Sequence, residues 1–291
     1  MNILVAINDN YFKPLQTMLL SLARTNRDHL DLYLMSSELS HKNTIKLEIY
    51  VRNICHGTLH TIEVSKDFLN SAPIGNHFSK EMYYRIFCSN FLPQTLDKIL
   101  WLDADIIIIK DISDLYSMDF QGCSIIACDE RQGVGLEDIA RGCNIRLGRR
   151  EEQRYFNSGV MLFNLDKIRK QFSEEHVLKL IDLKKDILVS PDQDILNLVY
   201  DDDVIFADAI RFNYQVHFDW KVNNEQMLVS NQTCILHYIG PWKPWQPKNI
   251  HFTFKYYWNI RIRQGYIVEW LTYKLLSLLL KAKEKMTKGG I

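Results

Sequence analysis

Short apolar stretches recur along the 291-residue chain, with helical patterns in several of the gaps between them. Five stretches have the length and composition of strands: residues 3–7, 32–35, 59–64, 98–102 and 124–128. Apolar residues at helical spacing predict helices over residues 11–25, 41–53 and 79–90, and Asn8 or Asp9 can cap the first of them. Strands that alternate with helices build mostly parallel sheets, so the pattern predicts an α/β fold. With 47% hydrophobic residues the chain can bury a sizeable core.

The second half of the chain continues the alternation less regularly. RYFNSGVMLFNL (154–165) predicts a strand, residues 166–184 predict one helix, and another helix is expected to begin near Pro191. The segment 129–153 mixes arginines with Gly and acidic residues, which predicts a long loop. Loops of that length in compact domains are often functional lids.

Composition excludes some classes of protein. Lys plus Arg and Asp plus Glu number 35 each, which disfavours nucleic-acid binding because that function needs a basic surface. Six cysteines form no CxxC pair, so we expect reduced, mostly packed thiols. The N-terminus MNILVAINDNYF lacks a basic segment before its apolar run and predicts a first strand rather than a secretion signal. A cytoplasmic location is therefore expected.

The C-terminal segment has a different character. Residues 253–291 hold eight Lys or Arg and two Glu, a net formal charge of +6, and mix Trp, Tyr and Leu with the lysines. Its uninterrupted apolar part is far shorter than the roughly 20 residues that a spanning helix needs. An amphipathic helix of this kind lies in an anionic membrane interface, at the inner face for a cytoplasmic protein, or packs on its own domain or on a second copy. We accordingly divide the chain into residues 1–250 and a basic helical tail, 251–291.

Two carboxylates interrupt the apolar run ILWLDADIIIIKDI (99–112). Asp103 and Asp105 stand two residues apart and would point the same way along a strand, with Ala104 on the opposite face. An unpaired buried carboxylate is costly, so such a pair calls for a cationic partner or a metal ion. Ligands of open parallel sheets collect where strands end, and we expect this strand to end near Asp103.

Four further stretches are candidates for the same site. AINDNY ends the first strand with polar groups and an aromatic ring, which suits a flat base. FNSGVMLFN places Asn157 before two small residues, where a ligand can approach the backbone. SPDQDIL sets three polar residues at a helix start, and HYIGPWKPW presents a His, a Gly, a Lys and two Trp within nine residues. Taken singly, the SPDQDIL triplet is better explained as a helix cap and His237 as a core histidine.

Together these stretches resemble glycosyltransferase family 8, the retaining sugar transferases that include bacterial lipooligosaccharide galactosyltransferases and glycogenin. The resemblance runs from residue 2 to about residue 250, and its markers are NDNY, LDADIII as the D-x-D motif, NSGVMLFN, DQD and HYxGxxKPW. It implies a GT-A fold, in which helices flank a Rossmann-like nucleotide-binding sheet. It also implies transfer of galactose or glucose from a UDP-sugar to a glycan or lipid-linked acceptor, in lipopolysaccharide or other cell-surface glycan synthesis.

The resemblance implies roles for individual residues. Asp103, Asp105 and His237 would ligate a divalent cation, manganese or magnesium, with the imidazole favouring manganese. Lys243 would hold the β-phosphate beside the Gly240 backbone. The remaining residues implied to bind UDP or the donor sugar are Ala6, Asn8, Asp9, Asn10, Tyr11, His77, Arg85 and Ala104, together with Asp103. Some relatives have Asp where this chain has Asn8.

For the donor sugar the resemblance implies Asp129, Asn157, Asp192 and Gln193. Retention of configuration needs either a protein nucleophile or attack from the face that the diphosphate leaves. Gln193 would lie nearest the opposite face, but a neutral amide is a poor nucleophile, and Asp194, the better nucleophile by chemistry, is not expected to reach the sugar. We therefore favour same-face attack, with a diphosphate oxygen taking the acceptor's proton.

Three alternatives compete with this interpretation. A non-catalytic homologue would bind nucleotide sugar as a scaffold or as the partner of another transferase. A nucleotidyltransferase or nucleotide-sugar hydrolase would also use a D-x-D pair. This class and an NAD-binding enzyme both lack support, because the chain has no GxxxxGK[ST], and GVGLED (133–138) fails the GxGxxG pattern at its last glycine.

Overall fold

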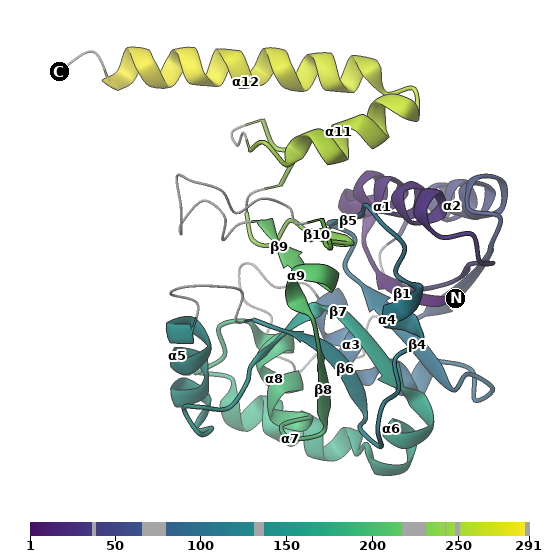
Figure 1. Cartoon of the computed structure of the whole chain (residues 1–291), viewed down its shortest axis with the longest axis vertical. Helices are drawn as coiled ribbons and strands as arrows, with labels where there is room; N and C mark the ends of the chain where they lie inside the picture. Colours follow the sequence, from purple (N-terminus) through teal and green to yellow (C-terminus); the bar gives the residue numbers. More distant parts are fainter. Residues whose placement is uncertain are drawn as a thin grey trace.

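A twisted seven-stranded sheet forms the centre of the molecule (Figure 1). The computed structural model describes residues 1–36, 39–65, 80–130, 137–216, 231–241, 243–247 and 251–288. The strand order is β3-β2-β1-β4-β7-β6-β8. The strands are β1 (Asn2–Ala6), β2 (Asp31–Ser36), β3 (Thr58–Glu63), β4 (Lys98–Leu102), β6 (Ile125–Asp129), β7 (Phe156–Asn164) and β8 (Val204–Ala207).

The sheet is mostly parallel, with β7 as the exception. β1 pairs in parallel with both β2 and β4, and β6 pairs in parallel with β8, whereas β7 runs antiparallel to its neighbours β4 and β6. All six strands expected from the sequence are present, and β4 ends at Leu102, directly before the paired aspartates. The expected α/β class and GT-A-like arrangement are confirmed.

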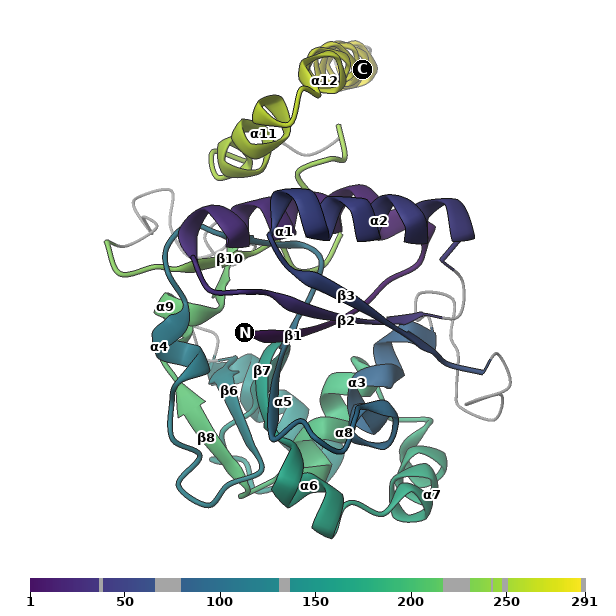
Figure 2. The same cartoon turned by 90° about the vertical axis from the view of Figure 1, so that its right-hand side faces the viewer.

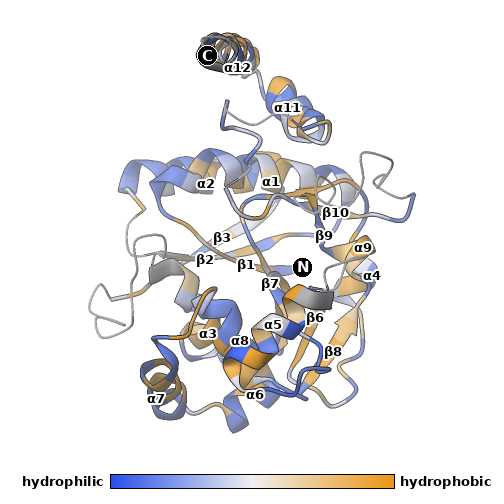
Figure 3. Ribbon diagram, turned by 90° about the vertical axis from the view of Figure 1, so that its left-hand side faces the viewer, coloured by the Kyte–Doolittle hydropathy of each residue, from blue (hydrophilic) through white to orange (hydrophobic). Residues whose placement is uncertain are grey.

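Helices cover both faces of the sheet (Figure 2). On one face lie α1 (Phe12–Thr25) and α2 (His41–Ile54), which bury residues such as Leu15 and Leu47 against the strands. On the other lie α3 (Lys80–Phe91) and α8 (Pro191–Val199), whose Phe87 and Ile195 belong to a second buried cluster. Figure 3 shows apolar strands inside the molecule and a largely polar α2 at its surface. Two cores therefore hold the sheet from opposite sides.

Two expectations about the second half were wrong in detail. The single helix expected over residues 166–184 is two helices, α6 (Leu165–Gln171) and α7 (Glu174–Lys184). Phe172 is extended and packs edge-on against Phe87, and the Ser173 side chain caps the new helix by accepting a hydrogen bond from the His176 backbone N–H. A residue that leaves helical geometry and is followed by a cap ends one helix and begins another.

The segment 129–153, expected to be one long loop, contains α5 (Glu137–Leu147). Ala140 and Leu147 are buried beside Tyr155, and these apolar positions are seven residues apart, which places them on one face of a helix. Among the described arginines of this segment, Arg141 pairs with Glu151, Arg146 with Asp194 and Arg149 with Asp201. This part of the chain therefore packs on the fold as a helix and is not one long loop.

A small second sheet stands next to the end of β4. It consists of β5 (Ile106–Ile108), β10 (Ile235–His237) and β9 (Tyr214–Gln215), in the order β5-β10-β9. β10 runs antiparallel to β5 and pairs His237 with Ile106, while β9 lies parallel to β10. The register therefore brings His237 beside the residue that directly follows Asp105.

Two C-terminal helices extend from the body (Figure 1). α11 (Phe254–Arg263) contacts α1, and its Trp258 packs against Tyr273 of α12 (Ile267–Lys288) with ring centroids 4.7 Å apart. Arg261 is fully buried and pairs with Glu269, which also pairs with Lys13. Among the helices that the structure describes, none has the length and apolarity needed to span a bilayer. The division at residue 250 remains a prediction.

Candidate active site

Chain segments far apart in sequence converge where β4 ends. The turn after β4 carries Asp103 and Asp105, β10 carries His237, and a following turn carries Lys243. These four side chains are buried to at least three quarters of their surface. The sequence motifs therefore assemble into one site.

Asp103, Asp105 and His237 present ligand atoms that all lie within 4.8 Å of one another. His237 Nε2 lies 3.2 Å from Asp105 Oδ1 and 3.8 Å from Asp103 Oδ2. Gly159 on β7 makes this approach possible, because a Cβ atom there would lie 2.2 Å from Cε1 of His237 and 3.0 Å from Asp103 Oδ2. The side-chain-free backbone at residue 159 is thus part of the wall behind the three ligands.

The donor set fits a divalent cation. Asp105 Oδ1 is buried and makes no hydrogen bond, although His237 Nε2 lies at ion-pairing distance. A buried oxygen without a donor is costly, and a cation held between it and an imidazole nitrogen would satisfy both. Two carboxylates and one imidazole suit manganese better than magnesium, which prefers oxygen ligands and water.

Lys243 supplies the positive charge nearest to this pair of acids. Its Nζ pairs with Asp105 Oδ2 and donates a 2.6 Å hydrogen bond to the Tyr238 carbonyl. Burial raises the pKa of Asp105, but the Lys243 ammonium beside it more than offsets this effect, and the pKa is held below its usual range. Burial lowers the pKa of Lys243, but Asp105 more than offsets this effect, so the pKa of Lys243 is raised. Both groups are charged at neutral pH.

Arg85 of α3 holds the opposite side of the site. Its guanidinium lies 2.9 Å from Asp103 Oδ1 and 3.2 Å from Asp192 Oδ2, and it donates a 2.7 Å hydrogen bond to the Ser158 carbonyl. Burial raises the pKa of Asp192, and Arg85 only partly opposes this effect. Arg85 also lies over the Trp101 ring, 4.5 Å from its centroid. A planar, five-donor guanidinium that stacks on an indole can hold two carboxylates apart in fixed positions.

An irregularity between β6 and β7 places the FNSG segment. The pairing shifts from Ala127↔Met161 to Cys128↔Asn157, so residues between them bulge from the ladder. Bulges re-aim side chains next to functional sites. Here Asn157 Nδ2 donates to Gln193 Oε1 at 3.0 Å, and the Ser158 N–H donates to the same oxygen at 3.1 Å. Asn157 and Gln193, both implied to bind the donor sugar, are therefore in contact.

Asp129 is the last residue of β6, next to the Asn157 segment of β7, and Glu130 follows it directly. Asp129 accepts a 2.6 Å hydrogen bond from Arg154, which lies over the Phe206 ring. Glu130 is buried, and its carboxylate accepts a 3.3 Å hydrogen bond from Gln215. Burial raises the pKa of Glu130 to about 7. Glu130 is not among the residues predicted from the sequence, because a single acid after Asp129 forms no pattern, and its burial becomes visible only in the folded sheet.

The polar residues after β1 divide between two neighbouring places. Asn8 Oδ1 accepts a hydrogen bond from the Asn10 N–H at 3.1 Å and so caps the short helix η1 (Asp9–Tyr11). Tyr11 packs edge-on against Trp245, 6.0 Å between ring centroids, next to the Lys243 segment. Tyr11 is thus on the side of the carboxylates, where a base could stack.

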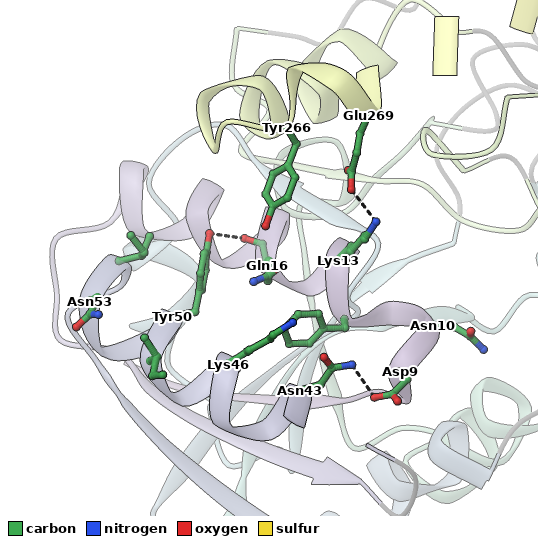
Figure 4. A pocket seen from close by; sticks show the side chains of 13 residues that line it. Asp9, Asn10, Lys13, Gln16, Asn43, Lys46, Tyr50, Asn53, Tyr266 and Glu269 are labelled. Carbon is green, nitrogen blue, oxygen red and sulfur yellow. Dashed lines mark hydrogen bonds and ion pairs between the residues drawn. The ribbon is translucent and has the colours of Figure 1, made fainter. Parts of the chain in front are cut away.

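The Asp9 side chain turns toward α2 instead (Figure 4). It accepts hydrogen bonds from the Ser40 N–H at 3.0 Å and Asn43 Nδ2 at 2.9 Å, and these bonds, the Ser40 one above all, lower its pKa. Asp9 and the exposed Asn10 also line a groove of about 850 Å³ between α1, α2 and the start of α12. The contact of Asp9 and Asn10 with a nucleotide base remains a prediction.

The other predicted site residues fall into place as follows. Ala6 ends β1, Ala104 is buried between the two aspartates, and Gly240 has a φ of +65°, which favours glycine. His77 lies outside the described residues.

Asp194 is excluded from the surface of the site. Its side chain is fully buried and accepts hydrogen bonds from Arg146 at 2.8 and 2.9 Å, from the Tyr155 hydroxyl at 2.7 Å and from the Val189 N–H at 2.8 Å. Four such bonds hold both oxygens inside the protein. Asp194 supports the start of α8, and Gln193 is the partly exposed residue beside it.

This fold and this grouping of carboxylates, imidazole and lysine fit a glycosyltransferase of the GT-A type. The family model of glycosyl transferase family 8 matches residues 2–249, and the chain belongs to that family.

Named relatives agree with this assignment. A lipopolysaccharide 1,2-glucosyltransferase of Escherichia coli K12 is 25% identical over 274 residues, covering 88% of this chain and 76% of the relative. Glycosyltransferase GlyF of Streptococcus pneumoniae is 26% identical over 89% of this chain, which spans only 61% of GlyF. The crystal structure of galactosyltransferase LgtC in complex with donor and acceptor sugar analogs shares the fold, with a TM-score of 0.76, 23% identity and coverage of 89% of this chain and 95% of LgtC.

Proposed function

We propose that this protein is a metal-dependent, retaining hexosyltransferase that moves galactose or glucose from a UDP-sugar to a saccharide acceptor. The observation that carries the proposal is the convergence of Asp103, Asp105 and His237 within 4.8 Å, with Lys243 on one side and Arg85 on the other. Family membership supplies the reaction class. The charges supply the reason why a diphosphate would bind here.

The residues divide the work of binding a nucleotide sugar. A divalent cation held by the three ligands would neutralise the diphosphate and stabilise it as a leaving group. Lys243, whose ammonium now pairs with Asp105, is placed to add a second positive charge to the β-phosphate. We propose that Asp192, which is held by Arg85 and by a 3.1 Å bond from the Ser158 hydroxyl, accepts hydrogen bonds from sugar hydroxyls.

Retention is proposed to proceed by same-face attack. The bond between C1 of the sugar and the diphosphate oxygen breaks, C1 bonds to the acceptor hydroxyl oxygen on the same face, and the hydroxyl proton passes to the departing diphosphate. Gln193 stabilises the developing positive charge from the opposite face. The burial of Asp194 supports this route, because the stronger nucleophile of the pair has no open path to the sugar.

The acceptor is proposed to be a lipid-anchored saccharide such as a lipopolysaccharide precursor. The E. coli K12 relative is a lipopolysaccharide 1,2-glucosyltransferase. α12 offers a matching surface: Val268, Leu271, Leu275 and Leu278 are each more than half exposed and recur every three or four residues. Such spacing places them on one side of the helix, and lysines at 274, 281 and 283 stand nearby. We propose that this stripe lies on an anionic bilayer, which would put the enzyme at the inner face of a membrane.

The proposed function is tested by thermal-shift titration of the purified protein. UDP, UDP-glucose, UDP-galactose and UDP-N-acetylglucosamine are each added with and without Mn²⁺. A ligand that binds only the native state raises the melting temperature, by an amount that grows with its affinity. We expect stabilisation that requires UDP and Mn²⁺ together, and the most effective sugar nucleotide names the donor.

Two outcomes would favour other functions. Stabilisation by UDP-sugar and Mn²⁺ without transfer to any saccharide acceptor would favour the scaffold or partner alternative. Absence of any shift would contradict nucleotide-sugar binding itself. An anomeric-configuration assay of the product by proton NMR then separates retaining from inverting transfer.

A further inference from the structure

Two side-chain amides, those of Asn213 and Asn157, connect the metal-ligand candidate His237 to Gln193. Asn213 follows the short helix α9 (Ala209–Phe212) and is hydrogen-bonded to both His237 and Asn157. Asn157 is in turn hydrogen-bonded to Gln193. We propose that Asn213 is a positioning residue that sets the proton position on His237 and, through Asn157, the orientation of Gln193. The proposal rests on the proposed function, because it assigns Asn213 to the same metal and donor-sugar site.

Two backbone N–H groups fix the direction of this chain of hydrogen bonds. The Gly159 N–H donates to Asn157 Oδ1 at 3.0 Å, and the Ser158 N–H donates to Gln193 Oε1 at 3.1 Å. A backbone N–H can only donate, so the atoms facing these groups must be oxygens. Asn157 Nδ2 then necessarily points to Gln193 Oε1, 3.0 Å away.

The direction propagates from Asn157 back to the histidine. Because Asn157 presents Oδ1, the Asn213 atom that lies 2.9 Å from it must be Nδ2. Asn213 Oδ1 therefore faces His237 Nδ1 at 2.8 Å, and an amide oxygen only accepts, so Nδ1 carries the proton. The lone pair of the neutral imidazole is left on Nε2, which is the nitrogen that faces Asp105 and Asp103.

This tautomer is the one that a metal ligand needs. Metal-binding histidines commonly donate their other ring N–H to a carbonyl or carboxylate, which fixes the ring and raises its basicity. Asn213 and His237 are both almost completely buried, so water does not compete for the bond. Asn213 would thus act on the metal through His237 and on the donor sugar through Asn157 and Gln193.

The two actions can be separated with two variants of one residue. Asn213→Asp keeps an oxygen for His237 Nδ1–H but faces Asn157 Oδ1 with a second acceptor. Asn213→Ala removes both bonds. Asn144→Ala is the matched control, because Asn144 is an equally buried amide on α5, away from the site, and donates to the Glu151 and Gln153 carbonyls that follow this helix.

The first readout is Mn²⁺ affinity in the presence of UDP, measured from the electron paramagnetic resonance signal of free Mn²⁺. We expect Asn213→Ala to weaken Mn²⁺ binding about 10- to 100-fold, while Asn213→Asp stays within about three-fold of the unmodified protein. Both should lower kcat with the UDP-sugar. Asn144→Ala should lower the melting temperature and leave Mn²⁺ affinity unchanged. Equal Mn²⁺ affinity in Asn213→Ala, or equal losses in both Asn213 variants, would overturn the proposal.

The second readout needs no change at Asn213 and covers the case in which its variants do not fold. ¹⁵N NMR of the histidine-labelled protein with Mg²⁺ and UDP should show the His237 proton on Nδ1, assigned by its loss in His237→Gln. A proton on Nε2 would overturn the proposal. Failure of the unmodified protein to bind Mn²⁺ with UDP would instead contradict the proposed function, so the two failures are distinguishable.

Discussion

Gly159 of β7 and His237 of β10 approach so closely that an added Cβ atom at Gly159 would lie 2.2 Å from Cε1 of the imidazole and 2.9 Å from Nδ1. Gly159→Ala is therefore expected to displace His237 and weaken Mn²⁺ binding by at least about ten-fold, with a stability loss on the order of 1–3 kcal/mol from overpacking. Mn²⁺ titration and urea unfolding measure the two effects.

Gly142 provides the control for this change. It lies in α5, and a Cβ atom there would meet nothing within 4 Å. Gly142→Ala should leave Mn²⁺ affinity unchanged and raise stability by about 0.5–1 kcal/mol through helix propensity. Unaltered Mn²⁺ affinity in Gly159→Ala would show that His237 does not need its present position.

The buried pair of Asp105 and Lys243 is expected to show strong energetic coupling. Removing one partner leaves the other charge buried, so Asp105→Asn and Lys243→Met should each destabilise the metal-free protein by about 3–5 kcal/mol. The double variant should lose less than the sum, with a coupling of about 1–3 kcal/mol in a double-mutant cycle from urea unfolding. Additive losses would mean that the two side chains do not interact in solution.

Asp194 and Gln193 are expected to differ in kind despite being neighbours. Asp194→Asn removes the charge that faces the Arg146 guanidinium, so we expect a stability loss of about 3–5 kcal/mol but residual turnover per folded molecule. Gln193→Ala should change stability by less than about 1 kcal/mol and lower kcat strongly. Urea unfolding and turnover corrected for the folded fraction separate the two effects. A stable but inactive Asp194→Asn protein would assign Asp194 a direct role.

Glu130 is expected to make stability depend on pH. Its pKa of about 7 in the folded protein lies above the ordinary 4.5, because burial disfavours the carboxylate. Between these values the native state keeps a proton that the unfolded chain releases, so stability falls as pH rises from about 4.5 to about 7. Glu130→Gln removes this loss, so the variant should be more stable than the unmodified protein at pH 8. The difference in unfolding free energy between the two proteins should shift in favour of the variant by on the order of 3 kcal/mol from pH 4 to pH 8.

Urea unfolding across this pH range is the measurement. Glu48→Gln, a change at an exposed glutamate of α2, serves as the control and should leave the pH dependence as it is. Parallel curves for the Glu130→Gln variant and the unmodified protein would show that Glu130 is ionised in both states.

The exposed stripe of α12 is expected to bind anionic bilayers. Leu271, Leu275 and Leu278 are 53%, 58% and 66% exposed, and changing all three to Gln should abolish co-sedimentation with vesicles that contain anionic lipid. Vesicles of neutral lipid should bind the unmodified protein far less, because the lysines then have no partner. Concentration-dependent dimerisation lost in the same variant, without vesicle binding, would identify the stripe as a contact between two copies.

The strands and the paired acids were predictable because their signals are local. Leu100 to Leu102 form an apolar run that only a buried strand explains, and Asp103 interrupts it at once. The sequence therefore predicted six strands of the sheet, helices α1 and α2, and the turn after β4 at the positions that the structure shows.

Other features depend on contacts that no local pattern reports. α5 was missed because polar and charged residues and a glycine separate its apolar residues, and few of these are buried. Asn213 was missed because its partners lie 24 and 56 residues away in sequence. The sequence offered one indication that Asn213 has a special role: it is a polar residue between Phe212 and Tyr214, just as the aspartates interrupt an apolar run. Asp194 was not expected to reach the sugar, but its partner Arg146 could not be predicted, because Arg146 lies on the unexpected helix α5.

The small sheet of β5, β9 and β10 has a consequence for how the protein is made. Lys243 and its partner Asp105 are 138 residues apart in the chain, and the pairing of β10 with β5 brings these two residues together. Contacts of such long sequence separation form slowly, and during synthesis the N-terminal part emerges first. A growing chain can therefore build its large sheet well before residue 237 is available, and throughout that interval it has no complete binding site for metal or nucleotide.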